Sequence, residues 1–524
     1  MTSFTGTLLL ARLAVRRDLV SLLAWSVLIA VVLTGTVSAM DATYPSAAQR
    51  AGYALSMSDA PVQHFFNGPG EALGTLGGIV VFEFGGYLLV VVAVLSIMTV
   101  VRHSRAEEAN GGAELIGAGC TGRYALGASA LLVAMGTALW WAVVAAMTLG
   151  TAGTGWAGAV AYGSSLALSG TIFAVLTAVT CQLAEQPRTA ALLASLVLLF
   201  SFVVRGWGDM RDSAIRWASP LAWAQATRPF GQVRWWPLVV AGVFVLVCVS
   251  FAMLLNNRRD IGAGWWRPRP GSTTASRYLA SPLGIVLSQQ RASIAGWCTA
   301  IGLLGIVFGL VTTEFAAAEG QIDVEAFAPG ELDPVLALTT FATKVLAILA
   351  TSAGIGLLRV PVVEQQTGRL DALLASSLGR IRWLGCQIAG AMGGASLALL
   401  LGGSGLMVGT AIAGVDSNPM DMVRLAVSYL PATWLLTSLA AMLFGVLPRW
   451  QPAAWLLVIH AVLAGVFGVM LRLPDWLIDL SPFSNVPQIP QESLVDAGLG
   501  IMVAVAALLL GAGLAGFRQR DIVC

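Results

Sequence analysis

Charged residues are scarce in this sequence of 524 residues. Only 11% of the residues are Asp, Glu, Lys or Arg, whereas 57% are hydrophobic and the mean hydropathy is +0.81. Because a soluble domain carries about 25% charged residues, this composition predicts a chain that is solvated mainly by lipid. The net charge of +2 provides no basic surface of the kind that binds nucleic acid.

Cysteine is also rare, and its positions do not suggest a disulfide framework or a metal site. The six cysteines fall in hydrophobic runs or in segments that we predict to be cytoplasmic: 120, 181, 248, 298, 386 and 524. None of them forms a Cys-x-x-Cys pair. The three histidines, His64, His103 and His460, are isolated in the sequence and are not predicted to bind a metal or to act as bases.

Lysine occurs once, as Lys344, and this excludes one kind of chemistry. A P-loop requires Gly-Lys-Ser/Thr, since its lysine contacts the phosphates of the nucleotide. Lys344 instead follows Thr343 inside a hydrophobic run. We therefore predict that the chain is not an enzyme, carries no cofactor and cannot hydrolyse ATP by itself.

Long apolar runs dominate the rest of the sequence. A helix needs about 20 residues to cross roughly 30 Å of hydrocarbon. Twelve such runs lie at residues 19–39, 78–101, 124–149, 159–183, 189–206, 235–256, 292–313, 335–358, 383–414, 425–447, 451–471 and 497–517. A glycine-rich turn at residues 150–155 separates the third run from the fourth. We expect an all-α membrane protein with about twelve transmembrane helices.

The distribution of charge predicts how these spans are oriented. With both termini in the cytoplasm, most arginines lie in cytoplasmic segments, as the positive-inside rule requires. The segment after the seventh span carries acids and no basic residue, so we expect it to face outward: Glu314, Glu319, Asp323, Glu325, Glu331 and Asp333. Residues 205–236 interleave five arginines with five tryptophans, which fits an interfacial or re-entrant element at the outer headgroups.

The sequence contains an internal repeat. Residues 102–123 match residues 359–380 at a constant offset of 257, and both lie between the second and third spans of their half. Shorter matches pair Ser219-Pro220-Leu221 with Ser481-Pro482-Phe483 and Arg259-Asp260-Ile261 with Arg520-Asp521-Ile522. We therefore expect two tandem six-helix halves, 1–256 and 291–524, joined by a linker at 257–290 with cytoplasmic and interfacial parts. Equal orientation of the halves implies a pseudo-two-fold axis along the membrane normal.

Each copy of the repeated segment places two acids around a glycine. In a continuous helix, Glu107, Gly111 and Glu114 would lie on one face at i, i+4 and i+7. The second copy repeats this spacing as Glu364, Gly368 and Asp371. A solvated loop helix explains one such motif on its own, but recurrence in both halves favours docking to a cytoplasmic partner.

The second copy resembles a known family. Its pattern resembles the segment between the second and third spans of type-2 ABC exporter permeases: Arg359, Glu364, Gly368, Arg369, Asp371, Leu373, Leu374 and Ala375. Within that family the chain is most similar to a fused two-half actinobacterial branch of polyketide antibiotic and multidrug exporters, which implies a bacterial plasma membrane protein. Gly112 and Gly117 of the first copy depart from the pattern, since the second copy has Arg369 and Leu374 there.

The resemblance implies that residues 102–123 and 359–382 are coupling helices. They would be seated on two copies of a separate cytoplasmic ATP-binding-cassette subunit, which would carry the ATP and Mg. The coupling residues that the resemblance implies are Glu107, Gly111, Glu114, Arg123, Glu364, Gly368, Arg369, Asp371 and Arg380. The implied function is the membrane-spanning subunit of an exporter of hydrophobic or amphipathic compounds, including drugs and antibiotics.

Two other functions remain open from the sequence. A proton-coupled secondary multidrug transporter of the major-facilitator type also has twelve spans in two parallel halves. Such proteins carry a Gly-x-x-x-Asp-Arg-x-Gly-Arg-Arg motif after the second span, which residues 102–108 do not match. A membrane scaffold without transport is the third reading, and co-purification of an ATP-binding subunit would distinguish the first function from both.

Two charged residues lie clearly inside predicted spans, Glu83 and Lys344. Charge in hydrocarbon is costly and usually functional, so we expect both residues in the substrate pathway. We predict that they form an ion pair, direct or water-bridged, across a cleft between the halves in at least one conformational state. Phe82, Tyr87 and Phe341 are further candidates, although aromatic residues at helical spacing are more often packing, and Glu83 alternatively lies at the outer headgroups.

Overall fold

The structure is a computed structural model that describes residues 3–58, 60–260, 262–266, 274, 276–317, 333–415, 418–468, 471, 473–487, 489 and 496–521. These residues form helices and loops, with no strand among them. They divide into two compact units, Met1–Pro270 and Gly271–Cys524, which we call the first half and the second half. The predicted outward-facing acids Glu319, Asp323, Glu325 and Glu331 lie outside the described residues, as do Ile261, Ile522 and Cys524.

The first half contains six helical segments long and apolar enough to cross a membrane. They are α1 (Thr7–Thr43), the second span formed by α4 (Leu76–Val80), the π-helix η1 (Val81–Gly85) and α5 (Gly86–His103), then α8 (Ala125–Thr151), α9 (Trp156–Leu183), α10 (Pro187–Met210) and α12 (Trp236–Asn257). Shorter helices connect them: α2 (Ala47–Ser58), α3 (Pro61–Asn67), α6 (Arg105–Ala109), α7 (Gly112–Gly117), η2 (Ala214–Ala218) and α11 (Pro220–Gln225). The predicted turn between the third and fourth spans is confirmed, because α8 ends at Thr151 and α9 begins at Trp156.

The second half repeats this order with five such segments among its described residues. They are α13 (Pro282–Ala317), α14 (Pro334–Leu357), α17 (Arg380–Ile412), the pair α18 (Pro419–Ser428) and α19 (Leu430–Val446), and α22 (Ala497–Gln519). The shorter helices are η3 (Arg277–Ala280), α15 (Arg359–Gln366), α16 (Arg369–Leu374), η5 (Pro448–Ala453), α20 (Ala454–Gly465), α21 (Asp475–Asp479) and η6 (Pro482–Ser484). The all-α membrane fold is therefore confirmed, while the axis that relates the halves stays a prediction.

The eleventh predicted span, residues 451–471, differs from the expected full-length helix. The 12-residue helix α20 ends at Gly465 and is about 18 Å long, whereas a bilayer core is about 30 Å thick. Pro448 and Pro452 lie in the 3₁₀ turn that precedes it. At its other end a side chain on Gly468 would lie 2.2 Å from the Ala464 carbonyl oxygen, so the chain turns there only because the residue is glycine.

Close helix contacts build the interior of each half. In the first half α9 packs against α5, α8, α10 and α12. In the second half α13 and α17 pack along each other, and a side chain on Gly305 would lie 2.1 Å from the Gly402 carbonyl oxygen. Small residues let membrane helices approach closely, which replaces the hydrophobic driving force that lipid does not supply.

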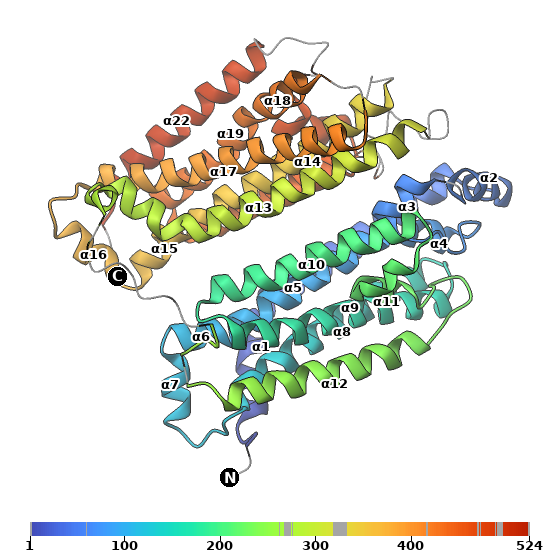
Figure 1. Cartoon of the computed structure of the whole chain (residues 1–524), viewed down its shortest axis with the longest axis horizontal. Coiled ribbons are helices and arrows are strands. Elements are labelled where there is room, and N and C mark those ends of the chain that lie inside the picture. The colour runs from blue at the N-terminus through green and yellow to red at the C-terminus, as the bar shows by residue number, and fades with distance from the viewer. Residues whose placement is uncertain are drawn as a thin grey trace. The chain divides into compact units, whose positions relative to one another are not determined.

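The repeated segments lie at the same end of their half as a chain terminus. In the first half, α6 and α7 lie near the N-terminus, and in the second half α15 and α16 lie near the C-terminus (Figure 1). Backbone hydrogen bonds join Gly122 to Thr5 and Tyr124 to Ser3. Ser3 and Thr5 therefore lie beside the end of the first repeated segment, and Arg520 contacts Gln365 of the second.

Candidate functional site

The two repeated segments share one local fold. In the first copy α6 ends at Ala109 and α7 begins at Gly112; in the second, α15 ends at Gln366 and α16 begins at Arg369. Gly111 and Gly368 precede the second helix with φ of 76° and 68°, in the left-handed region that favours glycine. The expectation of one continuous helix face is therefore wrong, because a left-handed glycine ends the first helix and redirects the second.

The matched glutamates point toward the helices of their own half. Arg17 of α1 forms an ion pair of 2.8 Å with Glu107. Glu364 is only 7% exposed, and its carboxylate accepts a hydrogen bond of 3.1 Å from Gln289 of α13. Both glutamates thus tie their segment to the first span of their half, and the buried Glu364 does not belong to an open docking surface.

The second helix of each segment carries the exposed residues. Glu114 of α7 is exposed, as are Arg369 and Asp371 of α16. Each acid lies in the first turn of its helix, where it complements the partial positive charge of the helix N-terminus. Leu115 of α7 is 81% exposed. The exposed face of α7 is therefore acidic and partly apolar, whereas that of α16 carries an acid and a base, and both helices offer charged groups to a partner.

The arginines at the ends of the segments make internal contacts. The Nη2 atom of Arg123 donates to the carbonyl oxygens of Asn256 and Asn257 at 3.1 Å each, at the end of α12. In the second half, Nη1 of Arg380 donates to the carbonyl oxygen of Arg520 at 2.9 Å, just after α22. A cation at a helix C-terminus satisfies carbonyls that have no partner within the helix. Arg123 and Arg380 therefore join each segment to the last span of its half.

Glu83 lies on the π-helix of the second span, a kind of element that often occurs at functional sites. Its carboxylate accepts hydrogen bonds from the hydroxyl of Tyr53 in α2 and, at 3.5 Å, from the amide of Asn67 in α3. Burial and the adjacent Glu83 carboxylate raise the pKa of Tyr53 well above its ordinary value, so Tyr53 is the donor. Sequence reasoning missed Tyr53 and Asn67 because they lie on short helices outside the spans.

Lys344 lies in α14, one turn after Phe341. Its side chain packs against the end of α20, where a Cβ on Gly465 would be 3.7 Å from the Lys344 Cδ atom. Ser481 reaches the same place, and its buried hydroxyl has no hydrogen-bond partner among the described residues. Within the described part of the chain, neither Lys344 nor Glu83 has an oppositely charged partner in its own half.

Arg205 is a buried charge that sequence reasoning placed at the headgroups. Its side chain is 2% exposed in α10, within a segment long enough to span the membrane. Its Nη2 atom donates to the carbonyl oxygens of Phe65 and Phe66 at 2.8 and 2.9 Å, and its Nη1 atom donates to Gln225 at 3.2 Å. The expectation of a snorkelling side chain is therefore wrong for Arg205, which caps the end of α3 beside Asn67.

Comparisons with known proteins extend to the whole chain. The chain is 32% identical over 535 aligned residues to the Multidrug efflux system permease protein Rv1217c of Mycobacterium tuberculosis, and the alignment covers 100% of this chain and 96% of that relative. Residues 279–518 match the family model described as Multidrug efflux system permease Rv1217c, C-terminal domain. The chain belongs to the multidrug efflux system permease family. The model match includes the second repeated segment, and the full-length alignment includes both.

The remaining pathway candidates of this permease lie around the second span. Phe82 is 3% exposed and lines a cavity of about 30 Å³ with Asn67, Tyr162 and Gln225. Tyr87 follows in α5 and is half-buried, as is Phe341 in α14. The cavity beside Phe82 has room for one water molecule, so the first half alone has no drug-sized site there.

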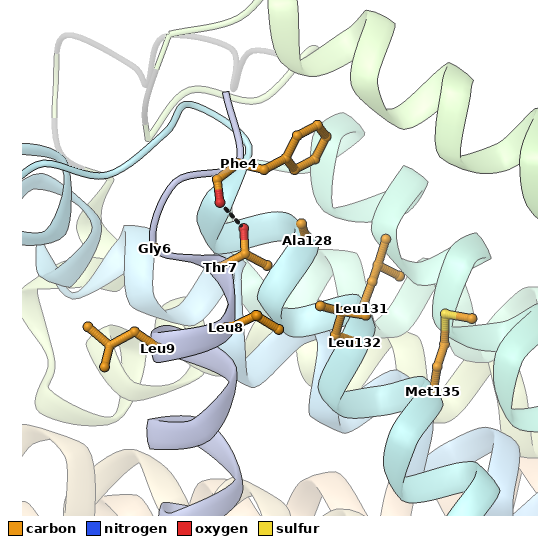
Figure 2. Close-up of a pocket in the computed structure, with 9 residues that line it drawn as sticks. All are labelled: Phe4, Gly6, Thr7, Leu8, Leu9, Ala128, Leu131, Leu132 and Met135. Carbon is orange, nitrogen blue, oxygen red and sulfur yellow. Dashed lines mark hydrogen bonds between the residues drawn. The ribbon is translucent and has the colours of Figure 1, made fainter. Parts of the chain in front are cut away.

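An apolar pocket of about 700 Å³ lies elsewhere in the permease, between the N-terminus of α1 and α8. Its lining comprises Phe4, Gly6, Thr7, Leu8, Leu9, Ala128, Leu131, Leu132 and Met135 (Figure 2). The Thr7 hydroxyl donates to the Phe4 carbonyl oxygen at 2.7 Å. The lining therefore presents carbon atoms, and it contains none of the predicted pathway residues.

The histidines and acids of the described part of the chain are spread over separate elements. No three His, Cys, Asp or Glu side chains among these residues come together as a metal site would require. His103 is engaged with Asp18 of α1, and His460 with the Leu477 carbonyl oxygen. The described residues instead provide two segment helices that each carry an exposed acid, the buried Arg205, and the half-buried Glu83 and Lys344.

Proposed function

We propose that this chain is the membrane-spanning subunit of an ATP-driven exporter of hydrophobic or amphipathic compounds, of the type-2 ABC class. Family membership supports the export of drugs, since the relative is a multidrug efflux system permease. The apolar composition of the spans favours a bulky apolar cargo over a sugar or an ion. The chain would lie in a bacterial plasma membrane with both termini in the cytoplasm.

The observation that carries the ATP-driven part of this proposal is the matched fold of the repeated segments. Both have a left-handed glycine followed by a short helix with an exposed acid, Glu114 or Asp371. Two segments with the same fold would fit two copies of one partner. We therefore propose a homodimer of a cytoplasmic ATP-binding subunit that carries ATP and Mg and contacts α7 and α16.

The proposal is tested with the purified chain in lipid nanodiscs, alone and with the ATP-binding subunit that is cross-linked to it in native membranes. We expect no ATP turnover by the chain alone, because its one lysine lies in a span, and we expect turnover by the complex that rises with added drug. ATP turnover that stays with the chain through rigorous purification would overturn the proposal.

A cellular measurement separates the ATP-driven exporter from a proton-coupled one. Cells expressing the chain and its partner are loaded with ethidium, and efflux is followed after either a protonophore at maintained ATP or depletion of ATP at maintained proton gradient. We expect efflux to stop only when ATP is depleted. Loss of efflux with the protonophore alone would favour a secondary transporter.

A further inference from the structure

The repeated Arg-Asp-Ile motif follows the last span of each half, and its arginine bridges three elements. In the first half, Nε of Arg259 donates to Oε1 of Gln182 at 2.5 Å, in the last turn of α9. Its Nη1 and Nη2 atoms donate to the two carboxylate oxygens of Glu108 in α6, at 2.8 and 2.6 Å. Only 5% of the Arg259 side chain is exposed. The arginine therefore joins the last span, the fourth span and the repeated segment.

The second half makes the same bridge with different partners. Nη1 of Arg520 donates to the Phe444 carbonyl oxygen at 2.8 Å, in the last turn of α19. Its Nη2 atom donates to Oε1 of Gln365 in α15 at 2.6 Å. The guanidinium also lies over the rings of Phe444 and Phe517, at 5.3 Å from each centroid. Again the last span, the fourth span and the repeated segment meet at one guanidinium.

The partners correspond through the repeat. Glu108 and Gln365 differ in position by 257, the offset that relates the two segments. Each directly follows the matched glutamate, Glu107 or Glu364, that contacts the first span. A guanidinium suits this place because its planar array of donors can satisfy two separate acceptors at once. The arginine therefore binds a carboxylate, Glu108, in the first half and a neutral amide, Gln365, in the second.

We propose that Arg259 and Arg520, the arginine clamp, are positioning residues that hold each repeated segment to the ends of the fourth and last spans of its half. Through them the segment moves as one body with those two spans. The proposal deepens the proposed function, because such a body would carry movement from an ATP-binding partner at α7 or α16 into the membrane.

The clamp is tested by hydrogen–deuterium exchange on the full chain in nanodiscs. Arg520→Gln is expected to raise amide exchange in residues 359–374 by about tenfold or more and to leave residues 105–117 unchanged. The reason is that local opening of residues 359–374 no longer requires the contacts of Arg520 to break. Arg259→Gln is expected to do the reverse. Arg518→Gln and Arg258→Gln, at exposed neighbouring arginines, are matched controls that should change neither segment.

A conservative variant and a transport measurement separate positioning from general stability. Arg520→Lys keeps the charge but reaches one acceptor where arginine reaches two, so exchange in residues 359–374 should be intermediate. Ethidium efflux at equal membrane expression should fall in the order wild type, Arg520→Lys, Arg520→Gln. The exchange measurement uses no ATP-binding subunit, so it tests the clamp even if the proposed function fails.

Two outcomes would overturn the clamp. One is unchanged exchange in the segment whose arginine was replaced. The other is increased exchange in both segments together, which would show that the arginines stabilise the whole chain and do not position one segment. If exchange rises only in the matched segment while ethidium efflux stays at the wild-type rate, the clamp stands and the proposed route of coupling fails.

Discussion

At the residue scale, Glu108 occupies a more charged site than its counterpart Gln365. Glu108 pairs with both Arg105 and Arg259, and all three side chains are nearly buried, at 11%, 1% and 5% exposure. In the second half, Val362 stands at the position of Arg105, so Arg520 alone faces the amide of Gln365. The two halves therefore show two ways to neutralise one site.

This difference predicts a rescue. Glu108→Gln leaves two buried guanidiniums without a carboxylate, and removal of one member of a buried ion pair costs about 3–5 kcal/mol. The double variant Arg105→Val, Glu108→Gln places the residues of the second half at these two positions. We expect it to recover part of the lost stability, because the carbonyl oxygens of Glu185, Gly262 and Ala263 lose the donors of Arg105. The midpoint of thermal unfolding in nanodiscs measures both variants. Losses that simply add would show that Arg105 and Glu108 do not act as a pair.

Tyr53 provides a second prediction at this scale. Tyr53→Phe removes the hydroxyl that donates to the Glu83 carboxylate and leaves this half-buried acceptor with Asn67 as its one donor among the described residues. We expect the free energy of unfolding to fall by about 1–3 kcal/mol. Tyr278→Phe is the matched control, since Tyr278 is 50% exposed and should change stability little. An unfolding midpoint for Tyr53→Phe equal to that of Tyr278→Phe would contradict the role of this hydrogen bond.

At the element scale, the angle between the two helices of each segment depends on one glycine. Around both Gly111 and Gly368 a Cβ would meet no atom within 4 Å, so a side chain is disfavoured there only by the backbone conformation. A left-handed residue other than glycine costs roughly 1–2 kcal/mol. The surroundings of both glycines are open, so this cost would act mainly on the direction of α7 or α16.

We therefore predict a graded series at Gly368. Gly368→Ala should reduce ethidium efflux and drug-stimulated ATP turnover, while Gly368→Asn should retain more of both, because asparagine tolerates the left-handed region. Gly379→Ala is the control, with φ of −67° and equally open surroundings. Equal losses for Gly368→Ala and Gly379→Ala would indicate that the backbone conformation at Gly368 is unimportant.

The position of these segments was predictable from the sequence, but their fold was not. The constant offset identified residues 102–123 and 359–380 because a repeat shows in the letters alone. The break at Gly368 depends on a conformation that glycine permits and does not demand. The burial of Glu364 depends on Gln289, which is distant in the sequence and comes close only when α13 packs beside the segment.

At the scale of the whole molecule, the spans were predictable because lipid imposes a length on any apolar helix. Eleven of the twelve predicted spans coincide with long apolar helices of the described residues. The exception, residues 451–471, is as apolar as the others, but Pro452 lies in the preceding 3₁₀ turn and α20 ends at Gly465. Residue composition does not show where a helix ends. In the structure the turn after α20 is marked by the close approach of Gly468 to the Ala464 carbonyl oxygen.

The half-buried charges within the spans of the two halves, Glu83 and Lys344, lead to the last prediction. Glu83 has hydrogen-bond donors but no cation in its own half, and Lys344 has no anion in its own half, among the described residues. A charge that is partly removed from water within a span is costly without a counter-charge, so we propose that the two pair in at least one state of the transport cycle. Glu83→Gln and Lys344→Met should each impair export or expression, and the double variant should recover part of the loss.

A double-mutant cycle on ethidium efflux at equal expression measures this coupling. If the two residues interact, the double variant loses less efflux than the sum of the two single losses; if they act independently, the losses add. The matched control combines Lys344→Met with Asp209→Asn, because Asp209 already lies 3.9 Å from both Arg205 and Arg216. We expect that control pair to be additive. Additive losses for Glu83 and Lys344 as well would end the pairing proposal.

Lys344 would then act without Glu83. Its ammonium group, close to the buried Ser481 hydroxyl at the end of α20, would bind an anionic group of the cargo.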